Sequence, residues 1–190
     1  EPGVPEMNAY IEEVLKEGET LGFDGRVVSV GEGEGYAAIA GKKNAKVNYQ
    51  VDLIDEIWED RPVLSEEPAF NLDVKYAGET VASKLARIRE EMKEAGTNVH
   101  VVSTIDDICW TLNIRGNDID FFPLVLSYGI ITMDSFELYI DEKKLDDKLK
   151  AKLAKDGVNL HPYNDIYEDV KKFGSDVVAM IDPGKLNYAL

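Results

Sequence analysis

The fold follows from residues 124–140, which read LVLSYGIITMDSFELYI. The almost continuous apolar run at 124–132 is typical of a central strand that is buried on both faces of a sheet. Residues 136–140 alternate between inward and outward positions, and the short turn Met133-Asp134-Ser135 suits an antiparallel hairpin. These two strands predict the centre of a sheet.

Helices and strands alternate on both sides of this hairpin, which predicts an α/β domain with a mixed sheet flanked by helices. Thr104, with Asp107 three residues later, indicates a capping box at the start of one helix. Pro183 is expected to open a last helix. The predicted helices cover residues 80–95, 104–112, 145–154 and 163–173, and the further strands cover 98–103, 158–161 and 177–181.

The first 62 residues predict too few elements for a complete domain. Ser29 is a candidate helix cap, and Asp52 is expected to cap a short helix that carries Leu53, Ile54, Ile57 and Trp58. Residues 63–76 contain Pro68 and show no clear periodicity, which predicts a linker. The expected helices here are 7–17, 29–43 and 52–58, with strands at 20–24 and 46–51.

Residues 10–24 and 167–182 share the order helix, glycine, apolar strand, aspartate. Two ordinary helix–strand pairs would look alike in this way. Alternatively, residues 1–52 are the back half of a domain related to the second one, and the chain is then expected to begin and end inside longer units.

Net charge limits the partners of this chain. The 37 acidic and 21 basic residues among 190 leave a formal charge of −16. An acidic surface disfavours nucleic acid and anionic membranes, since both need basic contacts. The sequence contains no apolar run long enough to span a bilayer, and the single cysteine excludes an internal disulfide and a Cys-rich zinc site. A cytoplasmic setting is expected.

Several candidate motifs favour structural roles. The segment Gly31-Glu32-Gly33-Glu34-Gly35 lacks the spacing and the lysine of a phosphate-binding loop. His100 and His161 have no partner at metal-ligand spacing, and Cys109 has no neighbouring base that would make a reactive thiolate. These three residues are interpreted as core or strand-end side chains.

The loop Asn113-Ile114-Arg115-Gly116-Asn117-Asp118 is a stronger candidate for a binding role than these motifs. The planar fork of Arg115 suits a carboxylate of a substrate or a neighbouring domain, and Gly116 permits close approach of another backbone. Asn117 and Asp118 are typical turn residues. The alternative is a local turn in which Arg115 pairs with Asp118 or Asp120.

Three stretches resemble the three-domain aminopeptidase P enzymes, the Xaa-Pro aminopeptidases. They are Asp52–Pro62 (DLIDEIWEDRP), Thr104–Asp118 (TIDDICWTLNIRGND) and His161-Pro162-Tyr163. Cys109 departs from the usual alanine of the family, and Phe122 stands where asparagine commonly precedes the proline. The resemblance covers nearly the whole chain.

The resemblance implies a creatinase/prolidase N-terminal domain fold with a ribonuclease H-like motif. Residues 1–62 would be the C-terminal half of a first such domain, 63–76 a linker, and 77–190 the second domain. A C-terminal pita-bread domain outside this chain would hold two divalent metal ions, typically manganese, and would cleave peptides that have proline second.

The same resemblance implies a supporting role for this part of the enzyme. It would shape and gate substrate access, contact the catalytic domain, support a homodimer and show no activity alone. Asn113, Arg115, Gly116 and Asp118 become substrate-proximal or interdomain residues, none of them catalytic. The alternatives are a prolidase, a creatinase-like hydrolase, or a non-enzymatic binding protein with the same fold.

Overall fold

The computed structural model describes residues 3–190, which form two compact units. One unit comprises the chain up to Pro62 together with Pro183–Leu190, and the other comprises Val63–Asp182. The sequence placed residues 183–190 at the end of the second domain, whereas they pack within the first unit. The mixed α/β architecture that the sequence predicts is confirmed.

A five-stranded mixed sheet forms the centre of the second unit, in the order β8-β7-β6-β4-β9. The hairpin between β6 and β7 is confirmed, with Ile131 opposite Phe136, although β6 begins at Tyr128 instead of Leu124. Parallel pairs join β7 to β8 and β4 to β9. The strands are β4 Val99–Val102, β6 Tyr128–Thr132, β7 Phe136–Tyr139, β8 Val158–His161 and β9 Ala179–Met180.

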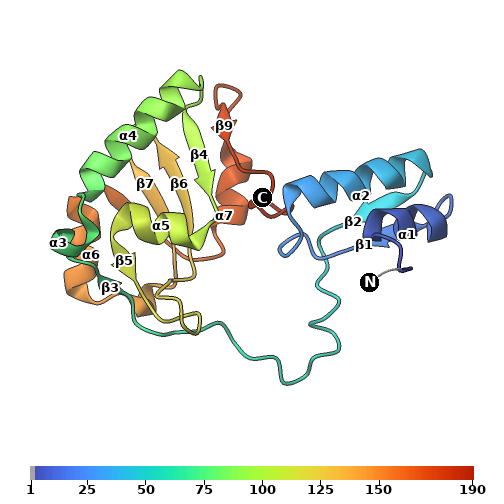
Figure 1. Cartoon of the computed structure of the whole chain (residues 1–190), viewed down its shortest axis with the longest axis horizontal. Helices are drawn as coiled ribbons and strands as arrows, with labels where there is room; N and C mark the ends of the chain where they lie inside the picture. Colours follow the sequence, from blue (N-terminus) through green and yellow to red (C-terminus); the bar gives the residue numbers. More distant parts are fainter. Residues whose placement is uncertain (1–2) are drawn as a thin grey trace. The chain divides into compact units, whose positions relative to one another are not determined.

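The two faces of this sheet carry different layers. Side chains such as Val102 and Leu138 join one core cluster with helices α4 (Val81–Glu94), α5 (Ile105–Leu112) and α6 (Asp147–Lys155), which therefore cover that face. Figure 1 shows α4 and α5 alongside β4, β6 and β7. On the opposite face, the hydroxyl of Tyr139 donates a 2.9 Å hydrogen bond to Asp169 at the end of α7 (Ile166–Asp169).

The expected linker at 63–76 is partly wrong. It contains β3 (Phe70–Asn71), which pairs with β5 (Ile114–Arg115), and the short helix α3 (Val74–Ala77). Asp73 caps α3 by accepting from the backbone of Lys75. A two-residue strand and a four-residue helix are too short to produce a periodic signal, which explains why the sequence pattern missed them.

Two further details of the second unit differ from expectation. The helix at 163–173 reduces to α7 and a 3-10 turn, η2 (Val170–Lys172), and a second 3-10 turn, η1 (Glu142–Lys144), precedes α6. The capping box at Thr104 is not formed, because its hydroxyl donates to the carboxylate of Asp107 instead of accepting from the backbone.

The first unit contains a two-stranded parallel sheet and two helices. The predicted cap at Ser29 is confirmed as a full capping box with Glu32. The helix expected at 52–58 is absent: Asp52 accepts from the backbone of Ile54, but only turns follow, and Ile57 is 76% exposed. The elements are α1 Met7–Val14, β1 Thr20–Gly22, α2 Val30–Lys42 and β2 Lys46–Asn48.

The helix expected after Pro183 is also absent. Residues 183–190 form turns whose backbone bonds to the start of α2, with the Gly31 amide donating to the Pro183 carbonyl at 2.8 Å. The ring of Tyr188 covers Gly33 so closely that a Cβ there would lie 2.2 Å from a ring carbon. This contact explains a glycine inside α2, where the residue otherwise weakens a helix.

Candidate functional site

The candidate loop begins at Asn113, which ends helix α5 in the left-handed conformation with φ 52°. Its side chain is fully buried and uses both ends of its amide. The nitrogen donates to the carbonyl of Glu79 at 2.9 Å, and the oxygen accepts from the ammonium of Lys84 at 2.7 Å. Asn113 therefore joins α5 to the beginning of α4.

Lys84 is a buried charge that the sequence analysis did not single out. Its ammonium also donates to the carbonyl of Trp110 at 2.6 Å and lies 4.3 Å from the centre of that indole ring. Burial lowers the pKa of Lys84. Nearby, the guanidinium of Arg87 holds Glu79 through two hydrogen bonds and, with Ser83, lowers the pKa of that carboxyl to about 2.

Arg115 is half-buried and faces its own loop. Its guanidinium donates to the carbonyls of Cys109 and Ile114, each at 2.7 Å. Neither Asp118 nor Asp120 is among its partners in the described part of the chain, so the local turn pairing is not formed. The same guanidinium nitrogen makes both bonds. The N–H groups on the other two nitrogens can therefore donate to another group.

Gly116 lies where the loop passes closest to the following segment. A Cβ at this position would approach the side chain of Val125 to 2.6 Å and the carbonyl of Leu124 to 3.3 Å. The close approach that the sequence predicts for Gly116 is therefore made to the protein itself.

Asp118 forms a buried ion pair that sequence reasoning missed. One carboxylate oxygen accepts from the ammonium of Lys144 at 2.5 Å and from the amide of Leu126 at 2.7 Å. The other oxygen is buried and has no hydrogen-bond partner among residues 3–190. The 26 positions between Lys144 and Asp118 left no local signal for this contact.

An exposed aromatic tip follows these anchored residues. Phe121 is completely exposed with φ 68°, and Phe122 is 61% exposed. A non-glycine residue with positive φ is uncommon and marks a constrained loop. In the sequence, only the pair of phenylalanines directly before Pro123 indicated this exposed aromatic tip. The loop thus has a tightly bonded base and an apolar tip.

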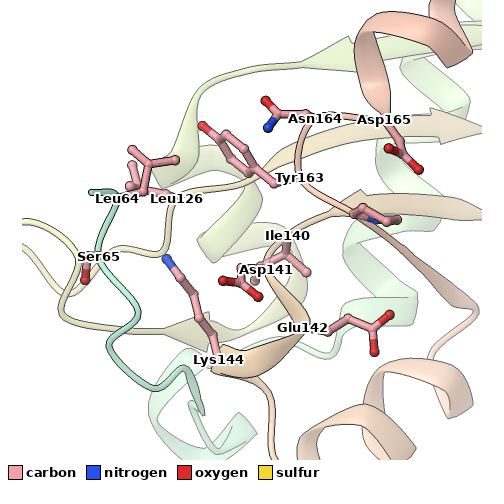
Figure 2. Close-up of a pocket in the computed structure, with 11 residues that line it drawn as sticks. Leu64, Ser65, Leu126, Ile140, Asp141, Glu142, Lys144, Tyr163, Asn164 and Asp165 are labelled. Carbon is pink, nitrogen blue, oxygen red and sulfur yellow. The ribbon is translucent and has the colours of Figure 1, made fainter. Parts of the chain in front are cut away.

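Lys144 also lines a cavity of the second unit. Its ammonium and the carboxylate of Asp141 point into the space between Leu126, Ile140 and Tyr163 (Figure 2). The volume of this cavity is about 580 Å³. The sequence pattern did not single out any residue of its wall as a binding residue.

The two histidines and the cysteine contact other residues of the second unit. Cys109 is buried, and burial raises the pKa of its thiol. His100 lies 3.0 Å from the carbonyl of Met180. His161 contacts Glu137 at 2.6 Å and stacks on the ring of Tyr139.

Between residues 3 and 190, no group of three or more metal-ligating side chains is placed to hold an ion, so these residues do not fit a metal site. Within the same range, no helix combines the length and the apolar character needed to cross a bilayer.

Three comparisons relate this chain to known proteins. The sequence profile of the Creatinase/Prolidase N-terminal domain matches residues 60–190. Aminopeptidase P2 of Arabidopsis thaliana is 35% identical over 193 residues, which cover 100% of this chain and 27% of the relative. A probable Xaa-Pro aminopeptidase P of Sordaria macrospora is 36% identical over 178 residues, covering 88% of this chain and 28% of the relative.

Among solved structures, the X-prolyl aminopeptidase of Caenorhabditis elegans, described as a cytosolic enzyme with a di-nuclear active site, superposes with a TM-score of 0.89. It is 31% identical, and the match covers 100% of this chain and 32% of that one. The chain therefore spans about a quarter to a third of the length of these relatives.

Proposed function

Because the chain belongs to the creatinase/prolidase N-terminal domain family, we propose that it is a non-catalytic part of an Xaa-Pro aminopeptidase. The observation that carries this proposal is the superposition of the whole chain on a solved X-prolyl aminopeptidase. The parent enzyme would be a metallopeptidase that releases the N-terminal residue from peptides with proline second.

Two divalent metal ions, for which we propose manganese, would lie in the part of the parent that this chain does not span. Bound there, such ions activate water for hydrolysis. The described residues of this chain do not fit a metal site, so no chemical step is assigned to them. Their role in the proposal is to shape and gate access of the peptide substrate, in contact with a catalytic pita-bread domain.

The loop at 113–118 is the proposed point of this contribution. Asn113, Gly116 and Asp118 hold its base through buried contacts. Arg115 retains guanidinium donors that suit a carboxylate of a peptide substrate or of a neighbouring domain. The exposed Phe121 extends from the same loop and supplies apolar surface for such a contact.

The domain assignment and the setting belong to the same proposal. The unit up to Pro62 would be the C-terminal half of a first creatinase-type domain, and the unit Val63–Asp182 would form the body of the second. We also propose a cytosolic location and support for a homodimer. The cytosolic description of the solved relative supports this location.

The parent protein tests the proposal directly. The full-length protein, supplied with manganese and an Xaa-Pro-Xaa peptide, should release the first residue, whereas the 190-residue chain should release none. Cleavage by the chain alone would contradict its non-catalytic role. An inactive parent that binds peptide without cleaving it would instead favour a binding protein of the same fold.

Arg115 can be tested against a matched arginine. Arg89 also donates its guanidinium to two backbone carbonyls, those of Thr132 and Ser135. We expect Arg115→Ala to lower kcat/KM of the parent about tenfold or more, as the loss of a charged hydrogen bond does. Arg89→Ala should lose comparable stability without this kinetic effect. Equal kinetics in both variants would leave Arg115 a structural role only.

A further inference from the structure

The cavity beside the end of β7 has the size of a small-molecule site. Its volume of about 580 Å³ lies within the range typical of ligand pockets. Its wall comes from four segments of the second unit: the chain at 64–65, Leu126, the turn after β7, and the turn after β8. The lining includes Leu126, Ile140, Asp141, Lys144 and Tyr163.

Lys144 supplies a buried cation to this wall. The residue is 3% exposed, and its ammonium is directed into the cavity (Figure 2). An ammonium has three donors. One is used by Asp118, and the others have no partner among residues 3–190. Since buried donors normally have acceptors, the cavity offers a place for an anionic or carbonyl oxygen.

Asp141 supplies an anion from the same turn. One of its oxygens accepts from the amide of Lys143, and the other has no partner between residues 3 and 190. Asp141 and Lys144 form no ion pair with each other, although both side chains point into the cavity (Figure 2). The wall therefore presents the ammonium of Lys144 together with three carboxylates, those of Asp141, Glu142 and Asp165. The carboxylate of Glu142 accepts from the ammonium of Lys150.

Apolar surface separates and surrounds these charges. Ile140 is fully buried, and Leu126 and Tyr163 lie around the same space. A simple anion would meet the carboxylate of Asp141, and a simple cation would meet the ammonium of Lys144. A ligand with both charges and an apolar body avoids either repulsion.

We propose that this cavity binds a free α-amino acid with an apolar side chain. The ligand carboxylate accepts from Lys144, its ammonium donates to Asp141, and its side chain packs on Leu126 and Tyr163. This binding is independent of the proposed peptidase function, because it concerns residues of this chain alone. Its failure would leave the peptidase proposal unchanged.

Three related probes test the ligand chemistry. L-leucine should bind the 190-residue chain in calorimetry and shift the amide NMR signals of Leu126 and Ile140. 4-Methylpentanoate lacks the ammonium and 3-methylbutylamine lacks the carboxylate, so each should bind about tenfold more weakly or worse. Equal binding of all three, or no binding of L-leucine, would overturn the proposal.

Variants of the two charged residues complete the test. Asp141→Asn keeps an oxygen for the amide of Lys143 but removes the charge, and it should weaken L-leucine binding about tenfold. Lys144→Met should abolish binding if it folds. Lys143→Met is the matched control, since that ammonium pairs with Glu66 and does not line the cavity. Unchanged affinity in Asp141→Asn would refute the assignment even if Lys144→Met does not fold.

Discussion

The ammonium of Lys144 lies 2.5 Å from the carboxylate of Asp118, and neither side chain exposes more than 2% of its surface. A buried pair of this kind makes only a small net contribution to stability compared with apolar residues, but breaking it leaves an uncompensated charge. The pair also holds the loop at 113–118 against the turn after β7.

Lys144→Met should therefore lower the free energy of unfolding by about 3–5 kcal/mol, measured by urea denaturation. Lys143→Met, which breaks the exposed pair with Glu66, should cost less than about 1 kcal/mol. The double variant Lys144→Met/Asp118→Leu should recover part of the loss. Recovery stays partial, because the amide of Leu126 then lacks its acceptor. Similar losses for Lys144→Met and Lys143→Met would contradict the importance of burial.

Two glycine-to-alanine substitutions should change the stability of the protein in opposite directions. Gly116→Ala forces a Cβ to 2.6 Å from Val125 and should destabilise the second unit by about 1–3 kcal/mol. Gly41→Ala, in α2 with nothing within 4 Å of the new Cβ, should stabilise by up to about 1 kcal/mol. Thermal denaturation of both variants measures the contrast. A stabilising Gly116→Ala would show that the loop approaches Val125 less closely than described.

Asn113 combines two effects that paired substitutions can separate. Asn113→Gly and Asn113→Ala both remove the hydrogen bonds to Lys84 and Glu79, but only alanine meets the steric cost of φ 52°. The free energy of unfolding of Asn113→Ala should therefore be lower than that of Asn113→Gly by about 1–2 kcal/mol. Asn44 has φ 51° on the exposed surface and is the control.

At Asn44 the difference between alanine and glycine should be similar, because the backbone conformation is the same. The loss common to both substitutions should be larger at Asn113, where the amide is buried. Chemical denaturation of the four variants gives both quantities. A common loss at Asn44 as large as that at Asn113 would contradict the buried hydrogen-bond account.

Acid stability should depend on Glu137. Burial acts to raise the pKa of this carboxyl, but hydrogen bonds from Ser135, His161 and Asn159 outweigh it and lower the pKa below its ordinary value of 4.5. A lowered folded pKa stabilises the protein above pH 4.5, and this contribution is lost as the pH falls through the folded value.

Glu137→Gln should therefore flatten the decline of stability below pH 4.5, seen in denaturation midpoints at a series of pH values. Glu94→Gln, on the exposed surface of α4, should alter the decline less. An unchanged acid profile in Glu137→Gln would show that the hydrogen bonds around this carboxylate do not favour its charged form.

The sequence alone determined the elements whose signals are local. The apolar run and alternation at 124–140 predicted the central hairpin, and Ser29 predicted a helix cap. Caps, turns and the period of apolar residues act over a few positions, so they can be recognised along the chain. The apolar residues at 52–58 wrongly predicted a helix, since an amphipathic helix needs a surface to cover and Ile57 remains exposed.

Only the tertiary structure decided which charged residues meet. Lys84 reaches Asn113 across 29 positions, and Lys144 reaches Asp118 across 26. No local pattern specifies such contacts, because the packing of helices and turns around the sheet brings the side chains together. The cavity between Asp141 and Lys144 arises in the same way. The sequence thus predicted the central sheet, whereas long-range packing positioned the groups that can bind a ligand.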